Sequence, residues 1–430
     1  MVESQSEVLS ADLGPISLRT IEGDAERNAF FRLAAATFAG GETAEMVEAW
    51  RALMLDGPNA SRFHLIGAFR DGAYLGGYAM DERTIRIGKA KLRCGFIGAV
   101  VAHPDFRRQG VAGELMRGSL DLARSRGLHL VILNGLAEFY DQFGYVDMFD
   151  PTECAVDLSA IAHLPASPYR LRPATVADAP ALIELYDRHL GRYAASTERH
   201  REDEAFRLAF MDRLQEQKST VPPDHTVVAE DESGRIRGYC AIPWGPFQFF
   251  GHEVAADDWP ALLAFLHHSS SIAGRQEDQT EIQFPLPPQS AMAFDLADHL
   301  PVRLTSTQQP RAGWMARIVD LPGAVDALQP AWNARWRQAN LEQKSTVSLA
   351  IDGDAWLITL GPEGVDVTRG TTTAETLYLS LRQWTQVIFG FRPITWVVAQ
   401  QEDPVPADLL QAFEALFPPI EPWIAPLDGF

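Results

Sequence analysis

The chain has 430 residues, with 57 acidic and 37 basic side chains, and its formal net charge at pH 7 is −20. Hydrophobic residues make up 46% and charged residues 22%, a balance typical of a globular protein, and the length allows about three domains. The negative charge argues against nucleic acid as a partner, because phosphates require a basic surface.

Targeting, membrane and metal signals are absent from the sequence. Residues 1–7 are acidic and lack the basic stretch of a signal peptide. No apolar run approaches the ~20 residues that a membrane helix needs. Cys94, Cys154 and Cys240 lie far apart without metal-ligand spacing, so we expect them to be buried and reduced. We therefore expect a cytoplasmic protein without a metal ion or a membrane partner.

The first part of the chain predicts a strand, a helix and a hairpin. Residues 18–21 have a short strand pattern, and a helix containing Phe30, Phe31 and Phe38 follows. Apolar stretches at 63–69 and 73–80 flank Arg70-Asp71-Gly72, which is a strong hairpin signal.

The run from Val100 to Gly113 is the most informative motif. A strand-like stretch ends at Pro104, two arginines follow, and Gly110-Val111-Ala112-Gly113 opens an amphipathic helix predicted over 114–126. A glycine turn before a helix presents backbone N–H groups without partners inside the helix, and the helix dipole adds positive charge. The pattern predicts a site for a phosphate-bearing ligand. The alternative is an ordinary strand-turn-helix with solvated arginines. Neither a Walker loop nor the spaced glycines of dinucleotide folds are present.

The same order of elements recurs about 150 residues later, which predicts two duplicated domains. Residues 169–172 predict a strand, 175–178 a capped helix start, and 225–242 a second hairpin. The stretch 251–259 lacks both the arginine pair and the glycine turn, and its two aspartates would repel a phosphate. We therefore expect only the first copy to bind the ligand.

The amino-acid composition changes near Trp314: seven of the ten tryptophans lie from there onward, which indicates a third domain. Residues 345–360 predict a hairpin, and 374–389 and 406–416 predict helices. The tryptophans fit a packed core or an apolar ligand tunnel, and core packing is the favoured interpretation. Proline-containing stretches at 164–168 and 310–313 predict linkers. The predicted fold class is α/β with mixed sheets, in domains 1–164, 165–310 and 311–430.

These motifs carry a family resemblance. Arg-x-x-Gly-x-Ala after a strand, at 107–112, resembles the pyrophosphate-binding motif of the GCN5-related N-acetyltransferases (GNAT), and Phe-Tyr before Phe-Gly-Tyr, at 139–145, resembles their catalytic tyrosine region. The chain ends in a proline-stiffened aromatic segment, 417–430. Two such domains, the second without its motif, followed by a domain similar to sterol carrier protein type 2, resemble the enhanced intracellular survival (Eis-type) N-acetyltransferases.

The resemblance implies acetyl transfer from acetyl-coenzyme A (acetyl-CoA) to a primary amine, aminoglycoside-like or on a lysine side chain. The amine attacks directly in a ternary complex, and the chain is a homo-oligomer, a hexamer by resemblance. Tyr140 is the implied general acid, because a phenol with a pKa near ~10 can protonate a thiolate whose thiol has a pKa near ~8.5. The α-carboxylate of Phe430 is the implied base. Tyr145 is assigned to packing.

The resemblance also implies which residues contact the cofactor. The backbone of three strand residues pairs with the pantetheine arm: Val100, Val101 and Ala102. The turn and helix start hold the pyrophosphate: Arg108, Gln109, Gly110, Val111, Ala112 and Gly113. Two residues flank the acyl group, Gly135 and Leu136. Characterised relatives carry Ser-Glu where this chain has Gly135-Leu136, which puts the substrate in doubt more than the acetyl transfer.

Two other functions compete with this hypothesis. The chain could sense acetyl-CoA without turning it over, or it could carry an apolar ligand in its third domain. His103 and Glu138 are alternative bases, but we expect the first to be structural and the second to be solvated.

Overall fold

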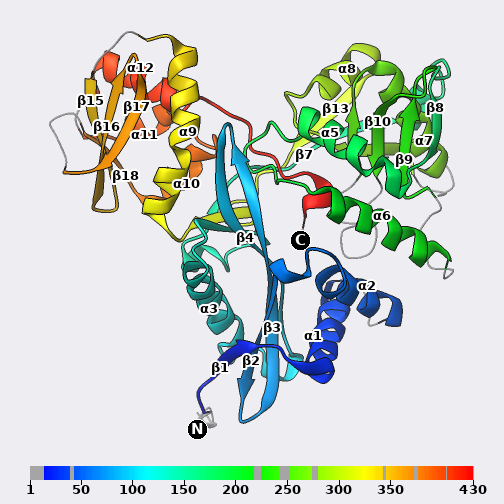
Figure 1. The fold of residues 1–430 in the computed structure, drawn as a ribbon, viewed down its shortest axis with the longest axis horizontal. Coiled ribbons are helices and arrows are strands. Elements are labelled where there is room, and N and C mark those ends of the chain that lie inside the picture. The colour runs from blue at the N-terminus through cyan, green and yellow to red at the C-terminus, as the bar shows by residue number, and fades with distance from the viewer. Residues whose placement is uncertain are drawn as a thin grey trace, which may run out of the picture.

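The computed structural model describes residues 14–38, 43–216, 224–241, 252–273, 279–341, 345–371, 376–402 and 404–429. Three units are arranged around the long strand β4 (Ala90–Ala102), with the first unit below and the second and third on either side above it (Figure 1). The C-terminal segment leaves the third unit and crosses to the junction of the first two (Figure 1).

The first unit is a mixed sheet in the order β1-β2-β3-β4-β5-β14-β6. Its elements up to the fifth strand are β1 (Ser17–Thr20), α1 (Gly23–Phe38), α2 (Ala44–Leu55), β2 (Phe63–Arg70), β3 (Ala73–Ile87), β4, α3 (Val111–Ser125) and β5 (Leu130–Gly135). Helices α1 and α3 cover opposite faces of this sheet (Figure 1). Side chains of a strand alternate between faces, so Tyr78 and Met80 pack with α3 whereas Ala79 packs with α1.

The predicted first hairpin is confirmed. Arg70 pairs with Ala73, and the turn residues Asp71 and Gly72 have φ values of +48° and +82°. Positive φ at both turn positions is the conformation that Asp-Gly favours between two strands.

The second unit repeats the order of the first, so the internal repeat is confirmed. Its elements are β8 (Arg170–Pro173), α5 (Ala179–His189), α6 (Arg201–Glu216), β9 (Thr226–Glu230), β10 (Ile236–Ala241), β11 (Glu253–Ala256), α7 (Trp259–Ala273) and α8 (Ala291–His299). Strands β8 to β11 form a sheet in the order β11-β10-β9-β8. The predicted helix start is present, because Thr175 and Asp178 form a reciprocal capping box.

The sheets cross the predicted domain boundaries at 164/165 and 310/311. Strand β7 (Thr152–Asp157) lies between β12 (Glu281–Pro285) and β13 (Val302–Ser306) of the second unit. Strand β14 (Gly313–Ile318), from the predicted third domain, pairs with β5 and with the short strand β6 (Val146–Asp147) of the first unit. Each of the first two units therefore contains a strand from beyond its predicted limit.

The third unit is a sheet in the order β17-β16-β15-β18 with helices packed against it. Its elements are α9 (Leu321–Ala339), β15 (Ser345–Ile351), β16 (Asp354–Gly361), β17 (Gly364–Arg369), β18 (Thr376–Leu379), α10 (Leu381–Ile388), α11 (Ile394–Val398) and α12 (Ala407–Leu416). The predicted hairpin at 345–360 and the helix at 406–416 are confirmed.

The single helix predicted over 374–389 is wrong. Residues 376–379 form a strand that pairs in parallel with β15, and α10 begins only after Ser380. Ser380 and Gln383 form a capping box that fixes this start, with Gln383 donating its N–H to the serine hydroxyl (3.2 Å). Residues 374 and 375 lie outside the described part of the chain.

Six of the seven C-terminal tryptophans are buried, which supports core packing. Trp332 and Trp384 meet edge to face with centroids 5.9 Å apart, and Phe417 packs against both. Cys94, Cys154 and Cys240 are buried free thiols. No helix in the described ranges is long and apolar enough to cross a membrane.

Candidate active site

Strands β4 and β5 are neighbours in the first sheet and then diverge. We call the gap between residues 97–102 of β4 and residues 133–135 of β5 the fork. The two strands run in parallel and pair only where residues 94–96 meet residues 130–132, although β4 continues to Ala102 and β5 to Gly135. A β-bulge lies just beyond, because the register with β3 shifts and Ala99 has a φ of +50°. Past Phe96 the edge of β4 therefore turns away from β5. Val100, Val101 and Ala102 lie on this diverging segment, where an extended ligand could pair as an added strand.

The glycine turn leads from the end of β4 into α3. Arg108 and Gly110 have φ values of +59° and +83°, and α3 begins at Val111. The N–H of Glu114 bonds to the carbonyl of Gly110 (3.0 Å), so the amides of 111–113 precede the first helical bond and point out of the helix end. These amides and the helix dipole are suited to an anion.

Gln109 fixes this turn to the hairpin beside it. Its side-chain oxygen accepts a hydrogen bond from Arg70 (2.8 Å), and its side-chain amide donates to the carbonyl of Asp105 (3.2 Å). Arg107 and Arg108 are exposed. Gln109 thus anchors the turn, while the side chains of Arg107 and Arg108 remain accessible to a charged ligand.

Tyr140 packs against the end of β5. A Cβ added at Gly135 would lie 2.5 Å from the Tyr140 ring and 2.8 Å from the Leu133 side chain, so the position of the ring requires glycine there. Burial raises the pKa of Tyr140 to about 12. The ring belongs to the same buried cluster as Ile97 of β4 and Leu133 of β5. Tyr140 therefore lies at the fork, and Leu136 beside it is 77% exposed.

The two alternative bases, Glu138 and His103, were expected to be solvated and structural, respectively. Glu138 is 70% exposed and pairs with Arg311 (2.8 Å). The His103 ring accepts a hydrogen bond from the backbone N–H of Asp105 (3.4 Å) and packs beside Phe106, with ring centroids 5.6 Å apart.

The second copy has carboxylates where the first has its glycine turn. At the start of α7, Asp258 accepts a hydrogen bond from the N–H of Ala261 (3.1 Å). Asp257 accepts hydrogen bonds from Arg188 and His189. Asp258 therefore already caps this helix end, and Arg237 pairs with both aspartates (3.8 Å to Asp257 and 2.9 Å to Asp258).

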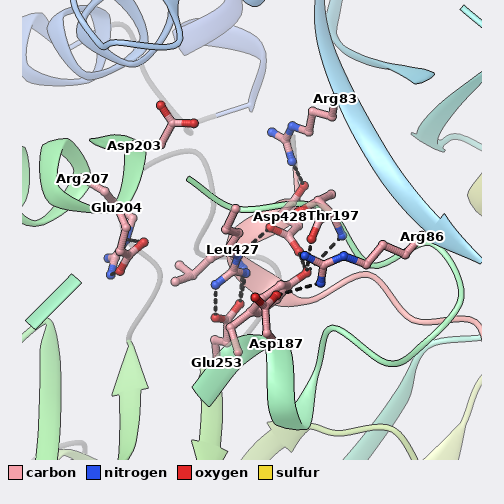
Figure 2. A network of polar contacts seen from close by, with 12 residues as sticks. Arg83, Arg86, Asp187, Thr197, Asp203, Glu204, Arg207, Glu253, Leu427 and Asp428 are labelled. Carbon is pink, nitrogen blue, oxygen red and sulfur yellow. Dashed lines mark hydrogen bonds and ion pairs between the residues drawn. The ribbon is translucent and has the colours of Figure 1, made fainter. Parts of the chain in front are cut away.

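The C-terminal segment is held between the first two units by buried polar contacts (Figure 2). The backbone N–H of Trp423 donates to the backbone carbonyl of Ala194 (2.8 Å), and the backbone N–H of Ala194 donates to the backbone carbonyl of Glu421 (3.0 Å). Asp428 is buried and accepts hydrogen bonds from the Tyr186 hydroxyl (2.7 Å) and the Arg199 guanidinium (2.9 Å).

Arg199 joins this segment to the second unit. Its guanidinium binds both carboxylate oxygens of Glu253 (2.6 and 2.8 Å), and Glu253 also accepts hydrogen bonds from the Tyr239 hydroxyl (2.6 Å) and the N–H of Leu427 (2.9 Å). Burial favours the protonated form of Asp428, but Arg199 and Arg83 outweigh burial and lower the pKa of its carboxyl.

Arg83 connects the segment to the fork. Its guanidinium donates to the carbonyl of Asp428 (2.7 Å), pairs with Asp81 (2.5 Å) and lies 4.7 Å from the centroid of the Phe96 ring. Phe96 is the last residue of β4 that pairs with β5. The described end of the chain therefore lies one side chain away from the fork. Phe430 itself lies outside the described residues.

Arg83, Arg199 and Glu253 were not predicted from the sequence. For Arg83 the available signal was a run of charged residues, 81–83, that follows eight uncharged residues of the same strand. A charged side chain in a buried strand position requires a partner, because burial of an unpaired charge is costly.

A cavity of about 160 Å³ lies between α2, α6 and the C-terminal segment. Its lining includes polar and charged side chains and an apolar group, the latter being Ala49, Leu53, Phe63, Phe206, Phe210, Met211 and Leu427. Asp428 and Gly429 form part of its wall. The cavity thus adjoins the end of the C-terminal segment, and Arg83 in its lining connects it to Phe96, where the pairing of β4 with β5 ends.

Residues 17–147, from β1 to β6, match a family model described as an acetyltransferase (GNAT) domain. The chain therefore contains an acetyltransferase domain, which is an enzyme domain, and the predicted α/β fold class is confirmed. No curated protein sequence matches the chain.

Solved structures share the fold over nearly the whole chain. A GCN5-related N-acetyltransferase from Kribbella flavida is 18% identical over 98% of this chain and 100% of that one, with a TM-score of 0.68. A GCN5-related N-acetyltransferase from Anabaena variabilis is 16% identical over 97% and 100%, with a TM-score of 0.67. Eis1 from Mycobacterium abscessus is 18% identical over 95% and 99%, with a TM-score of 0.58. At these identities the likeness shows the fold alone.

Proposed function

We propose that the chain transfers the acetyl group of acetyl-CoA to a primary amine within a ternary complex. The observation that carries the proposal is the fork between β4 and β5, which has the α3 turn at its mouth and Tyr140 against its wall. The amides of 111–113 would bind the pyrophosphate, and the pantetheine arm would pair with β4 at Val100, Val101 and Ala102. The acetyl group would then lie beside Gly135 and Leu136, next to Tyr140.

In this mechanism the amine nitrogen attacks the thioester carbonyl, and the carbon–sulfur bond breaks. The departing thiolate receives the hydroxyl proton of Tyr140, whose buried phenol stays protonated at neutral pH because its pKa is raised to about 12. The ammonium form of the acceptor must first lose a proton. We assign that role to the α-carboxylate of Phe430, as the family resemblance implies, and the anchoring of Asp428 beside the fork supports the assignment.

The resemblance extends the proposal beyond the chemistry. We propose that the third unit is a domain similar to sterol carrier protein type 2, that the chain assembles as a homohexamer, and that it acts in the cytoplasm. The likeness to Eis1 over the whole chain supports an Eis-type assignment.

The proposal is tested by incubating the purified chain with acetyl-CoA and a panel of amines, with free thiol and the mass of the acetylated amine as readouts. We expect thiol release that depends on the amine and one added acetyl group per thiol. A version with one residue appended after Phe430 should bind CoA normally and lose most of this turnover. Binding of CoA without thiol release for any amine would instead favour the sensor hypothesis.

Replacing Gly110 by alanine should weaken CoA binding about five- to thirty-fold, because an L-residue in the left-handed region costs about 1–2 kcal/mol and the turn would relax away from φ +83°. Isothermal titration calorimetry with CoA measures the change. Gly234→Ala is the matched control, since Gly234 has a φ of +80° and equal space around it but lies in the β9–β10 turn. Unchanged affinity in the Gly110 variant would remove the turn from the cofactor site.

A further inference from the structure

The cavity beside the C-terminal segment has a neutral lining. Every carboxylate among its described lining residues is paired with a cation: Glu198 with Lys91 (2.5 Å), Asp203 with Arg62 (2.7 Å), Glu204 with Arg207 (2.6 Å), and Asp428 with Arg199 (2.9 Å). A polycation is attracted by surplus negative charge. Among the described lining side chains themselves, four carboxylates are balanced by four arginines (Arg62, Arg83, Arg199 and Arg207), whereas Asp81 and Glu253 share Arg62 and Arg199 from behind the lining.

Part of the cavity lining is aromatic. Phe206 and Phe210 lie one turn apart on α6 and stack with centroids 6.1 Å apart and ring planes 6° apart. Phe63, Leu53 and Met211 add further apolar surface. Such a surface favours a flat apolar body, because aromatic rings pack well against one another in offset or edge arrangements.

The volume of the cavity is comparable to that of a site that holds one ring. An apolar cavity of about 150 Å³ admits one benzene molecule, and this cavity measures about 160 Å³. It therefore holds one ring, whereas an aminoglycoside has several polar rings that would remain outside.

We propose that the acceptor is a primary amine on a short carbon chain that ends in one aromatic ring, an arylalkylamine, rather than a polycation. This inference rests on the proposed acetyl transfer and narrows its substrate class. The ring would lie against Phe206 and Phe210, and the amine would point toward the end of the C-terminal segment at Gly429 and the fork beyond it.

The first test compares 2-phenylethylamine, ethylamine and kanamycin as acceptors for the full chain with acetyl-CoA. Burial of one ring should raise kcat/KM for 2-phenylethylamine about ten- to a hundredfold over ethylamine. Kanamycin should be the poorer substrate by about tenfold or more. A higher kcat/KM for kanamycin would overturn the inference and leave the proposed acetyl transfer intact.

The second test changes the aromatic wall. Phe206→Ala should lower the ratio of kcat/KM for 2-phenylethylamine over ethylamine about tenfold, mainly through KM. Phe294→Ala is the matched control, because Phe294 is a 52% exposed phenylalanine on α8 outside the cavity lining. Equal ratios in both variants and the wild type would contradict a ring site on α6, and CoA binding by each variant confirms that it is folded.

Calorimetric binding of 2-phenylethylamine in the presence of CoA separates the two proposals. Binding without acetylation would keep the arylalkylamine site and overturn the acetyl transfer. Acetylation of kanamycin without binding of 2-phenylethylamine would keep the acetyl transfer and overturn the arylalkylamine site. Failure of both binding and thiol release would overturn both.

Discussion

Tyr140→Phe should lower kcat by about 100-fold or more while leaving the affinity for CoA unchanged, because general acid catalysis contributes about 10²–10⁴-fold. The phenol lies at the fork, packed against Gly135, and its removal takes away only the proton donor. Single-turnover and steady-state thiol release measure the loss. The loss should appear in kcat and kcat/KM alike, which is the signature of an interaction made in the transition state.

Tyr145→Phe is the matched control for this substitution. The Tyr145 ring lies in the same buried cluster, 6.0 Å from the Tyr140 ring between centroids, and it packs without a role in the proposed chemistry. We expect turnover close to that of the wild type. Wild-type turnover in both variants would show that Tyr140 is not the acid. The same loss of turnover in both variants would point to a packing effect.

Arg199→Met should lower the free energy of unfolding by about 3–5 kcal/mol, because removing one partner of a buried ion pair leaves uncompensated charge. Two buried carboxylates, Glu253 and Asp428, would lose their shared guanidinium. Urea denaturation followed by tryptophan fluorescence measures the change. The C-terminal segment would also be released from its anchor, so amine turnover should fall with stability.

An exposed ion pair provides the comparison for this variant. Arg86 binds Asp187 (2.7 Å), but the Asp187 side chain is 46% exposed, so Arg86→Met should cost only about 0–1 kcal/mol. A triple variant, Arg199→Met with Glu253→Gln and Asp428→Asn, should recover part of the lost stability because no buried charge remains unpaired. A loss in Arg199→Met as small as that in Arg86→Met would contradict the role given to the network.

The features that the sequence predicted correctly depend on neighbouring residues. The Asp71-Gly72 turn and the capping box at Thr175 are each encoded within a few positions, so local chemistry is sufficient to locate them. The helix predicted over 114–126 is also present, but α3 begins three residues earlier, at Val111 directly after Gly110. The loss of the phosphate turn in the second copy could be recognised for the same reason.

The features that the sequence did not predict depend on contacts between distant segments. Asp428 meets Arg83, Tyr186 and Arg199, which precede it by 229 to 345 positions, and no periodicity indicates such a contact. The error at 374–389 was local, because buried Leu377 and Leu379 flank exposed Tyr378, an alternation typical of a strand.

Strands β7 and β14 tie the units together, because β7 lies between two strands of the second unit and β14, from the predicted third domain, pairs with β5 of the first. An excised N-terminal fragment that stopped at residue 164 would leave the backbone of β5 bare along six residues where β14 now pairs. It would also carry β7 without either of its neighbours. Such uncapped edges recruit other chains and favour aggregation. The first sheet is therefore complete only in a chain that extends to residue 318, well beyond the acetyltransferase match at 17–147.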